Sequence, residues 1–300
     1  MTAIFAAIFI CLLTVFFCYR YNKKTFDTID GILERILSKR YDELNKSTSD
    51  NRISKLIHKA NRVISMCVHE VTQTNAEKET IQGFISDMSH QMKTPLAAIA
   101  MYTELLAEGG LTEAEQQDFL TRMKVSTAKL QWMTESLIKM SRLETGIITP
   151  NPIESGIKQT ISESVLAAGK AADDRSIVVV DFDDVVLYHD KKWTVEAIGN
   201  IFENAVKYSE EGSEIIVTIK PMQQYTSINI TNKGAGIPRS DWHLVFKRFY
   251  RGANVRDKEG VGLGLYLVRL IMQKQSGYVM VDSVPNEYTT FSLFLQNCKK

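Results

Sequence analysis

The sequence predicts a multidomain protein, in which a transmembrane helix and a helical linker precede an antiparallel helical hairpin and a C-terminal α/β domain. Three observations support this prediction. An uncharged apolar run occupies residues 3–19, two later segments repeat apolar residues at spacings of three and four, and strand-like and helical segments alternate from residue 147 onward. With 300 residues, the chain is long enough for two or three domains.

The composition excludes one broad class of function. The chain is 44% hydrophobic and 24% charged, its formal net charge is +1, and it contains no polybasic run. A broad nucleic-acid-binding surface requires a clear excess of Lys and Arg. Binding to nucleic acid is therefore not expected.

Residues 1–20 are expected to form a single transmembrane anchor. The run AIFAAIFICLLTVFFCY carries no charge, and its 17 residues lie at the short end of what spans a hydrocarbon core. A cleaved secretory signal is the alternative, but no basic segment precedes the run and no A-x-A site follows it. Arg20, Lys23 and Lys24 follow directly, and basic flanks stay in the cytoplasm. We expect a minimal N-terminus outside and the rest of the chain inside.

Residues 21–76 are predicted to be a helical linker. Apolar residues recur only weakly there, and the polar segment NKSTSDN at 45–51 interrupts the pattern. Two connecting helices explain this better than a packed domain, although a short dimeric bundle is the alternative.

Residues 77–146 are predicted to form the helical hairpin. Apolar residues alternate by three and four in both halves, which is the spacing of a coiled-coil seam. The sequence EGG at 108–110 ends the first helix, and Thr112 with Glu115 forms a capping box for the second. One hairpin cannot bury both stripes, so we expect a dimeric four-helix bundle. A monomeric hairpin packed against the rest of the chain is the alternative. The predicted seam residues are Ile81, Ile85, Met88, Met92, Pro95, Ile99, Tyr102 and Leu106, then Phe119, Met123, Ser126, Leu130, Met133, Leu137 and Met140.

The last part of the chain, residues 147–300, is predicted to be one α/β domain. A segment with Gly and two prolines, TGIITPNPI, leads into it. Five strand-like segments follow, SIVVVDF, EIIVTIK, TSINIT, YVMVDS and TTFSLFL, with helical segments at 154–171, 190–208 and 262–276.

Three motifs in this domain indicate a bound polyphosphate. Asn200 and Asn204 stand four residues apart, on one helix face. A glycine-rich turn, TNKGAGIP, follows a predicted strand at 231–238. A second glycine loop, GVGLGLYLV at 260–268, runs into a helix, where backbone N–H groups suit phosphate. Each motif alone is weak, but the three in this order are a strong indication.

With two further motifs, SHQMKTPL at 89–96 and VFKRFYRG at 245–252, the chain resembles the sensor histidine kinases of bacterial two-component systems. The five motifs are similar to the H box, N box, first glycine box, F box and second glycine box, in the family's order, from about residue 77 to the end. The resemblance implies a Bergerat-type (GHKL) α/β sandwich that binds ATP and Mg²⁺ under a mobile lid, which would lie between the F box and the second glycine box.

The resemblance also implies a reaction and its partners. His90 would take a phosphoryl group from ATP and pass it to an aspartate of a separate response regulator, acting in trans. The protein would be a homodimer in a bacterial cell membrane, with its catalytic part in the cytoplasm. Thr94 matches the position that orients water when the family dephosphorylates the regulator.

Further site residues follow from the resemblance. The second Asn of the N box, here Asn204, would hold Mg²⁺, and Lys207 and Tyr208 match contacts to phosphate and adenine. Arg248 and Arg251 are the candidate phosphate contacts. The other implied nucleotide-binding residues are Asn200, Asn232, Gly234, Gly236, Gly260, Gly262 and Gly264.

His90 is predicted to face solvent. It lies two residues from each of the seam residues Met88 and Met92, so on a helix of 3.6 residues per turn it points away from the seam. Thr94 lies one turn further along the same face. Pro95 removes a backbone hydrogen bond to the Gln91 carbonyl, and we hypothesise that the bundle bends there as it switches between states.

Two residues depart from the family pattern. Gln91 stands where the family has an acid after the histidine; an amide can orient the imidazole but cannot accept its proton, and Asp87 is a candidate to assist. Asn232 stands where an Asp accepts a hydrogen bond from the adenine amino group, so we expect weaker binding of ATP. These departures support the alternative, a catalytically weak or inactive ATP-binding receptor that acts through partner contacts. ATP hydrolysis as the main activity is disfavoured, because Asn200 stands where related ATPases have a Glu.

Because we expect only a minimal segment outside the membrane, we expect no external ligand domain. We therefore expect a stimulus within the membrane or a membrane protein partner.

Overall fold

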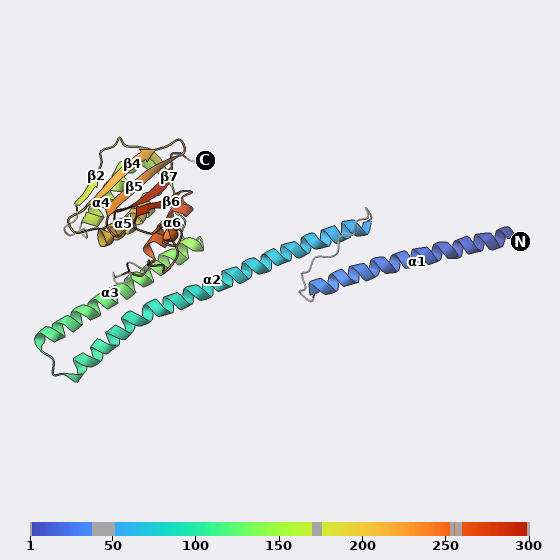
Figure 1. The fold of residues 1–300 in the computed structure, drawn as a ribbon, viewed down its shortest axis with the longest axis horizontal. Coiled ribbons are helices and arrows are strands. Elements are labelled where there is room, and N and C mark those ends of the chain that lie inside the picture. The colour runs from blue at the N-terminus through green and yellow to red at the C-terminus, as the bar shows by residue number, and fades with distance from the viewer. Residues whose placement is uncertain (1, 38–51, 170–175, 253–254, 256–259, 299–300) are drawn as a thin grey trace. The chain divides into compact units, whose positions relative to one another are not determined.

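The structure, a computed structural model, describes residues 2–37, 52–169, 176–252, 255 and 260–298 (Figure 1). The chain divides into two compact units, Met1–Ile85 and Ser86–Lys300. The predicted break at 45–51 lies outside the described residues, as does most of the predicted lid, at 253–254 and 256–259.

The first unit contains α1, Thr2–Leu37, and the first part of α2, Arg52–Glu108. The described large apolar side chains of α1 are exposed, among them Ile8, Leu12 and Phe16. Within the described residues, no helix combines the length and the hydropathy that crossing a membrane requires. The transmembrane anchor expected at residues 1–20 therefore stays a prediction.

The predicted hairpin is present in the second unit. The end of α2 and α3, Glu113–Glu144, are joined by a short turn in which Gly109 and Gly110 have φ of 75° and 79°. The predicted capping box also forms: the Thr112 N–H donates to Glu115 at 2.8 Å, and the Glu115 N–H donates to Thr112 Oγ1 at 3.4 Å. The rings of Tyr102 and Phe119 lie 5.2 Å apart, so the two seams meet near the turn.

The α/β domain is built on a seven-stranded sheet with the order β1-β3-β7-β5-β4-β2, in which β6 also pairs with β7. The strands are β1 Ile153–Gly156, β2 Ser176–Val179, β3 Val186–His189, β4 Glu214–Pro221, β5 Tyr225–Lys233, β6 Tyr278–Val284 and β7 Tyr288–Gln296. Only the pairing of β2 with β4 is parallel. The helix predicted from residue 154 is wrong at its start, because 154–156 belong to β1, which pairs with the unpredicted strand β3.

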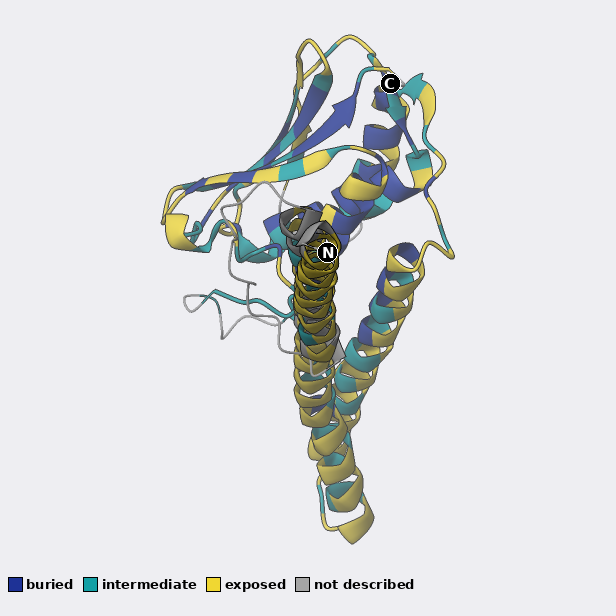
Figure 2. Ribbon diagram, turned by 90° about the vertical axis from the view of Figure 1, so that its right-hand side faces the viewer, coloured by how far each residue is buried: buried dark blue, intermediate teal, exposed yellow. Residues whose placement is uncertain are grey.

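Three helices pack side by side against the sheet: α4 Ile157–Gly169, α5 Lys191–Tyr208 and α6 Gly264–Lys274. Buried residues concentrate between these helices and the central strands, as Figure 2 shows. In α5, the buried side chains of Ile198, Ile201 and Phe202 form one stripe facing the core. The domain therefore has a core of its own.

The end of α3 packs against α6, and Met133, Met140 and Leu143 join the core of the domain. Polar contacts accompany this packing. Lys139 pairs with Glu196 of α5 at 2.7 Å, and Glu144 accepts hydrogen bonds from Arg248 and Tyr266. We call this contact region the α3 interface.

The burial of His189 predicts that the stability of the domain depends on pH. The ring is buried, its Nδ1 donates to the Leu187 carbonyl at 3.1 Å, and its Nε2 accepts from the Thr160 hydroxyl at 2.9 Å. Burial lowers the pKa of His189. Below pH about 6.5, the unfolded chain binds a proton that the folded site disfavours, so stability falls as the pH falls.

The free energy of unfolding of the wild type is expected to fall by up to about 1.4 kcal/mol per pH unit below pH about 6.5 through this group. Urea titrations followed by tryptophan emission at pH 8.0, 6.5 and 5.5 measure the slope. His189→Gln should lose the part of the slope that His189 contributes. His243→Gln, at an exposed position, should keep the slope of the wild type. Identical slopes in all three proteins would contradict the assignment.

Candidate functional site

A cavity of about 500 Å³ lies beside the C-terminal half of α5, the loop after β5 and the start of α6. This volume is sufficient for a nucleotide-sized ligand. Most of the nucleotide-binding residues predicted from the sequence line it: Asn200, Asn204, Lys207, Tyr208, Asn232, Gly236, Arg251, Gly260, Gly262 and Gly264. The other two predicted residues, Gly234 and Arg248, are not among the lining residues.

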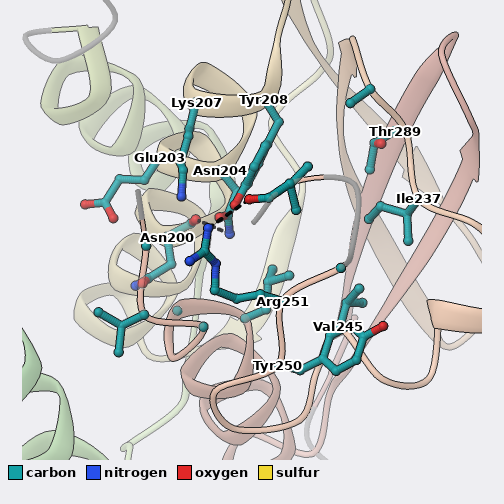
Figure 3. A pocket seen from close by; sticks show the side chains of 18 of the residues that line it. Asn200, Glu203, Asn204, Lys207, Tyr208, Ile237, Val245, Tyr250, Arg251 and Thr289 are labelled. Atoms are coloured by element: carbon teal, nitrogen blue, oxygen red, sulfur yellow. Dashed lines mark hydrogen bonds between the residues drawn. The ribbon is translucent and has the colours of Figure 1, made fainter. Parts of the chain in front are cut away.

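The two asparagines of α5 lie one turn apart and are fixed by the helix backbone. Asn200 Nδ2 donates to the Glu196 carbonyl at 2.8 Å, and Asn204 Nδ2 donates to the Asn200 carbonyl at 3.0 Å. Because each amide nitrogen donates to the backbone carbonyl four residues earlier, each amide oxygen points away from that carbonyl. Lys207 and Arg251 extend toward Asn204 from two directions in Figure 3. A neutral oxygen ligand and two cations therefore converge, which suits a polyphosphate.

Two glycines let their backbone segments lie close to residues at the end of α5. Gly260 has φ of 148°, and a Cβ there would collide with the Lys207 ammonium. Gly234 passes so close to the Tyr208 carbonyl that a Cβ would overlap it. The absence of a side chain at Gly234 thus lets the loop after β5 pack against the end of α5. Gly234 does not line the cavity, but it positions the loop that does.

The N-terminus of α6 opens onto the cavity at Gly264. Helix N-termini carry backbone N–H groups and a partial positive charge, both of which favour an anion. Glu203 and Asp241 add carboxylates to the lining. Burial, and then repulsion from Glu196, raise the pKa of Glu203.

Among the described residues, no group of three or more His, Cys, Asp and Glu side chains could hold a metal ion. Asn204 supplies an oxygen of the kind that Mg²⁺ prefers. The donor set of the cavity fits a magnesium ion that takes its other ligands from phosphate oxygens and water.

The H-box residues lie on α2 and are not among the residues that line the cavity. His90 and Thr94 are exposed, whereas Gln91 and Met92 are half-buried. The predicted outward direction of His90 is confirmed. Pro95 is buried, and α2 continues through it as one helix.

Two family models match the chain. The His Kinase A (phospho-acceptor) domain matches residues 80–146, and the Histidine kinase-, DNA gyrase B-, and HSP90-like ATPase matches residues 189–298. Together they cover more than half of the chain.

The chain belongs to the sensor histidine kinase family.

Curated relatives agree with this assignment. The chain is 29% identical over 232 residues to the sensor-like histidine kinase SenX3 of Mycobacterium tuberculosis (strain ATCC 25618 / H37Rv), an alignment that covers 76% of this chain and 57% of SenX3. It is 24% identical over 304 residues to the heme sensor protein HssS of Staphylococcus saprophyticus, covering 99% of this chain and 64% of HssS. The chain thus spans about three fifths of the length of these relatives.

A solved structure has the same fold. The histidine kinase ThkA, in complex with the response regulator protein TrrA, superposes with a TM-score of 0.61 at 16% sequence identity. The superposition covers 77% of this chain and 66% of that one. The arrangement of a helical hairpin followed by an α/β domain is therefore that of a known histidine kinase fold.

Several residues of the cavity were not predicted from the sequence. Thr289 and Phe291 of β7 line it, and Thr289 is the register partner of Asn232, so correct strand pairing would have revealed it. Val125, Ala128, Lys129 and Trp132 of α3 also line it. No pattern in the sequence indicates which face of α3 meets the domain.

Arg248, predicted as a phosphate contact, lies at the α3 interface. Its guanidinium donates to Glu144 and, at 2.9 Å, to the Tyr266 hydroxyl, and it lies 4.6 Å from the Tyr266 ring centroid. Burial, and then the hydrogen bond to Glu144, raise the pKa of Tyr266, so its hydroxyl stays a donor.

Gly260→Ala is expected to weaken ATP binding on the order of tenfold, because the added Cβ displaces Lys207 and strains a backbone with positive φ. Isothermal titration calorimetry with ATP and Mg²⁺ measures the change. Gly199→Ala, in α5 where a Cβ meets nothing within 4 Å, is the matched control. Equal affinities of the two variants would show that this approach of Gly260 to Lys207 does not matter for binding.

Proposed function

We propose that this protein is a membrane-anchored sensor histidine kinase that phosphorylates itself on His90 from ATP and transfers the phosphoryl group to an aspartate of a response regulator. One observation carries the proposal. The predicted nucleotide-binding residues converge on one cavity, while the predicted phosphoacceptor is exposed on a separate helix of the same chain. Donor and acceptor groups are thus both accessible and can be brought together by a domain movement.

ATP would lie with its phosphates near Lys207, Arg251 and the N-terminus of α6, and with its adenine near Asn232 and Tyr208. Asn204 would hold Mg²⁺ through its amide oxygen, together with phosphate oxygens of the nucleotide. Mg²⁺ bound there would neutralise charge on the phosphates during transfer. The chain's own contribution is to hold the γ-phosphoryl group in place and to exclude water.

His90 would act as the nucleophile. A neutral imidazole presents a lone pair at one ring nitrogen, which forms a bond to the γ-phosphorus as the bond to the leaving ADP oxygen breaks. Gln91, half-buried beside it, can orient the ring through a hydrogen bond but cannot accept its proton. Gln91 is therefore proposed as a positioning residue.

The response regulator would bind in trans, near the exposed face of α2. The relative ThkA was solved in complex with a response regulator, which supports a partner of the same kind here. Thr94 is exposed one turn beyond His90, where it could orient water for dephosphorylation of the regulator. We include this phosphatase activity in the proposal.

Dimerisation would complete the helical hairpin. Large apolar side chains stay exposed on α2 and α3, including Leu96, Met101, Leu120 and Ile138. Exposed apolar side chains of this kind are typical of an association surface. A second copy of the hairpin would cover it in a four-helix bundle.

Attachment to a bacterial cell membrane is proposed from the sequence. Residues 3–19 carry no charge, basic residues follow directly, and the described apolar side chains of α1 are exposed. A single-pass anchor over residues 1–20 would leave the catalytic part in the cytoplasm. A stimulus within the membrane or a membrane protein partner would then act on this anchor.

His90→Asn is expected to abolish incorporation of acid-labile phosphate from radiolabelled ATP while leaving ATP affinity unchanged, because residue 90 is not part of the cavity. His69→Asn, at another exposed position of α2, should be phosphorylated like the wild type. Phosphate incorporation into the His90→Asn variant would contradict the proposed reaction. No incorporation in the wild type, with normal ATP binding, would favour the inactive receptor.

Asn232→Asp is expected to tighten ATP binding by about five- to tenfold, because a charged acceptor makes a stronger hydrogen bond to the adenine amino group. Asn232 is buried on β5 and lines the cavity. Asn229→Asp introduces the same charge on the same strand, at a residue that does not line the cavity, and should leave affinity unchanged. Titration calorimetry decides, and an unchanged affinity of Asn232→Asp would refute the adenine contact.

A further inference from the structure

We propose that α3 of the helical hairpin forms part of the nucleotide site, with Lys129 binding the polyphosphate and Trp132 forming an apolar wall. This inference rests on the proposed binding of ATP. It assigns binding residues outside the α/β domain and makes bound ATP a bridge between that domain and the hairpin.

The four α3 residues that line the cavity form one continuous face. Val125, Ala128, Lys129 and Trp132 are spaced by three, one and three residues, which places them along one side of a helix. Asn204 of α5 lines the same cavity. A ligand that fills the cavity therefore touches both helices.

The α3 interface brings Lys129 to the cavity. Lys139 pairs with Glu196, which fixes one point of contact between α3 and α5. Lys129 lines the same cavity as Asn204 and Lys207, the residues proposed to bind Mg²⁺ and phosphate.

The charge of Lys129 also favours an anionic ligand. On α3, Arg122 and Lys139 have carboxylate partners at 2.8 and 2.7 Å. In the part of the chain that the structure describes, no carboxylate lies within ion-pair distance of Lys129, although the residue is half-buried. A polyphosphate would supply this charge, with Lys129 as a third cation beside Lys207 and Arg251.

Bound ATP would then stabilise the docked arrangement of α3 and the domain. Linkage is reciprocal, so the factor by which ATP favours the docked arrangement equals the factor by which docking increases the affinity for ATP. A change that moves α3 away from the cavity would therefore weaken ATP binding by that factor. The hairpin could thus influence nucleotide affinity through α3, a helix that carries none of the five sequence motifs.

The first test measures nucleotide affinity on the full chain by titration calorimetry. Lys129→Ala should weaken binding of ATP with Mg²⁺ by about tenfold, and Lys129→Arg should restore most of it. Adenosine, which has no phosphate, should bind both variants as it binds the wild type. Lys124→Ala removes the same charge from an exposed position of α3 that does not line the cavity and should have no effect.

The second test uses Trp132 as a reporter. ATP should change the tryptophan emission of the wild type, and Trp132→Phe should remove most of that change while ATP still binds; Trp193 and Trp242 remain as internal controls. The inference is overturned if ATP binds Lys129→Ala as tightly as the wild type, or if the emission change survives Trp132→Phe. A wild type that binds no ATP at all overturns the proposed function, and this inference with it.

Discussion

The site depends on the packing of α5 against the sheet. Its buried stripe, Ile198, Ile201 and Phe202, belongs to one hydrophobic cluster with Ile215, Ile228 and Leu293 of the central strands. Because side chains on a helix are 100° apart, fixing this stripe fixes the direction of Asn200 and Asn204 on the adjoining face. The asparagines need no loop to position them. Their geometry is as rigid as the core, which is what a site that must align a phosphoryl group requires.

Much of this organisation could be predicted from the sequence, because it depends on local periodicity. The seam of α3 from Phe119 to Met140 is buried or half-buried, although Met133 and Met140 lie in the core of the α/β domain and not within the hairpin. The outward direction of His90 followed from its spacing to the seam residues of α2. The strands β4, β5, β6 and β7 are long enough to show an apolar pattern. The four-residue strands β1 and β3 are not, and they exist because they pair with each other at the edge of the sheet.

Packing of the hairpin against the rest of the chain was considered as an alternative, but the residues of the α3 interface could not be predicted. They lie more than fifty positions apart, and their contacts follow no repeating pattern. Its ion pair between Lys139 and Glu196 is partly exposed, and such pairs contribute about 0–1 kcal/mol. Apolar contacts of Met133, Met140 and Leu143 supply the rest. An interface of this mixed character suits two parts that separate and reassociate during a reaction cycle.

The cluster of Glu144, Arg248 and Tyr266 has an evolutionary consequence. One carboxylate at the end of α3 accepts from both a guanidinium and a phenol hydroxyl, and Tyr266 lies two residues from the start of α6 at the cavity. Loss of any member leaves the others half-buried without their acceptor or donor. Among homologous kinases, these three positions should therefore covary, whereas solvent-facing positions of α3 should change independently of one another.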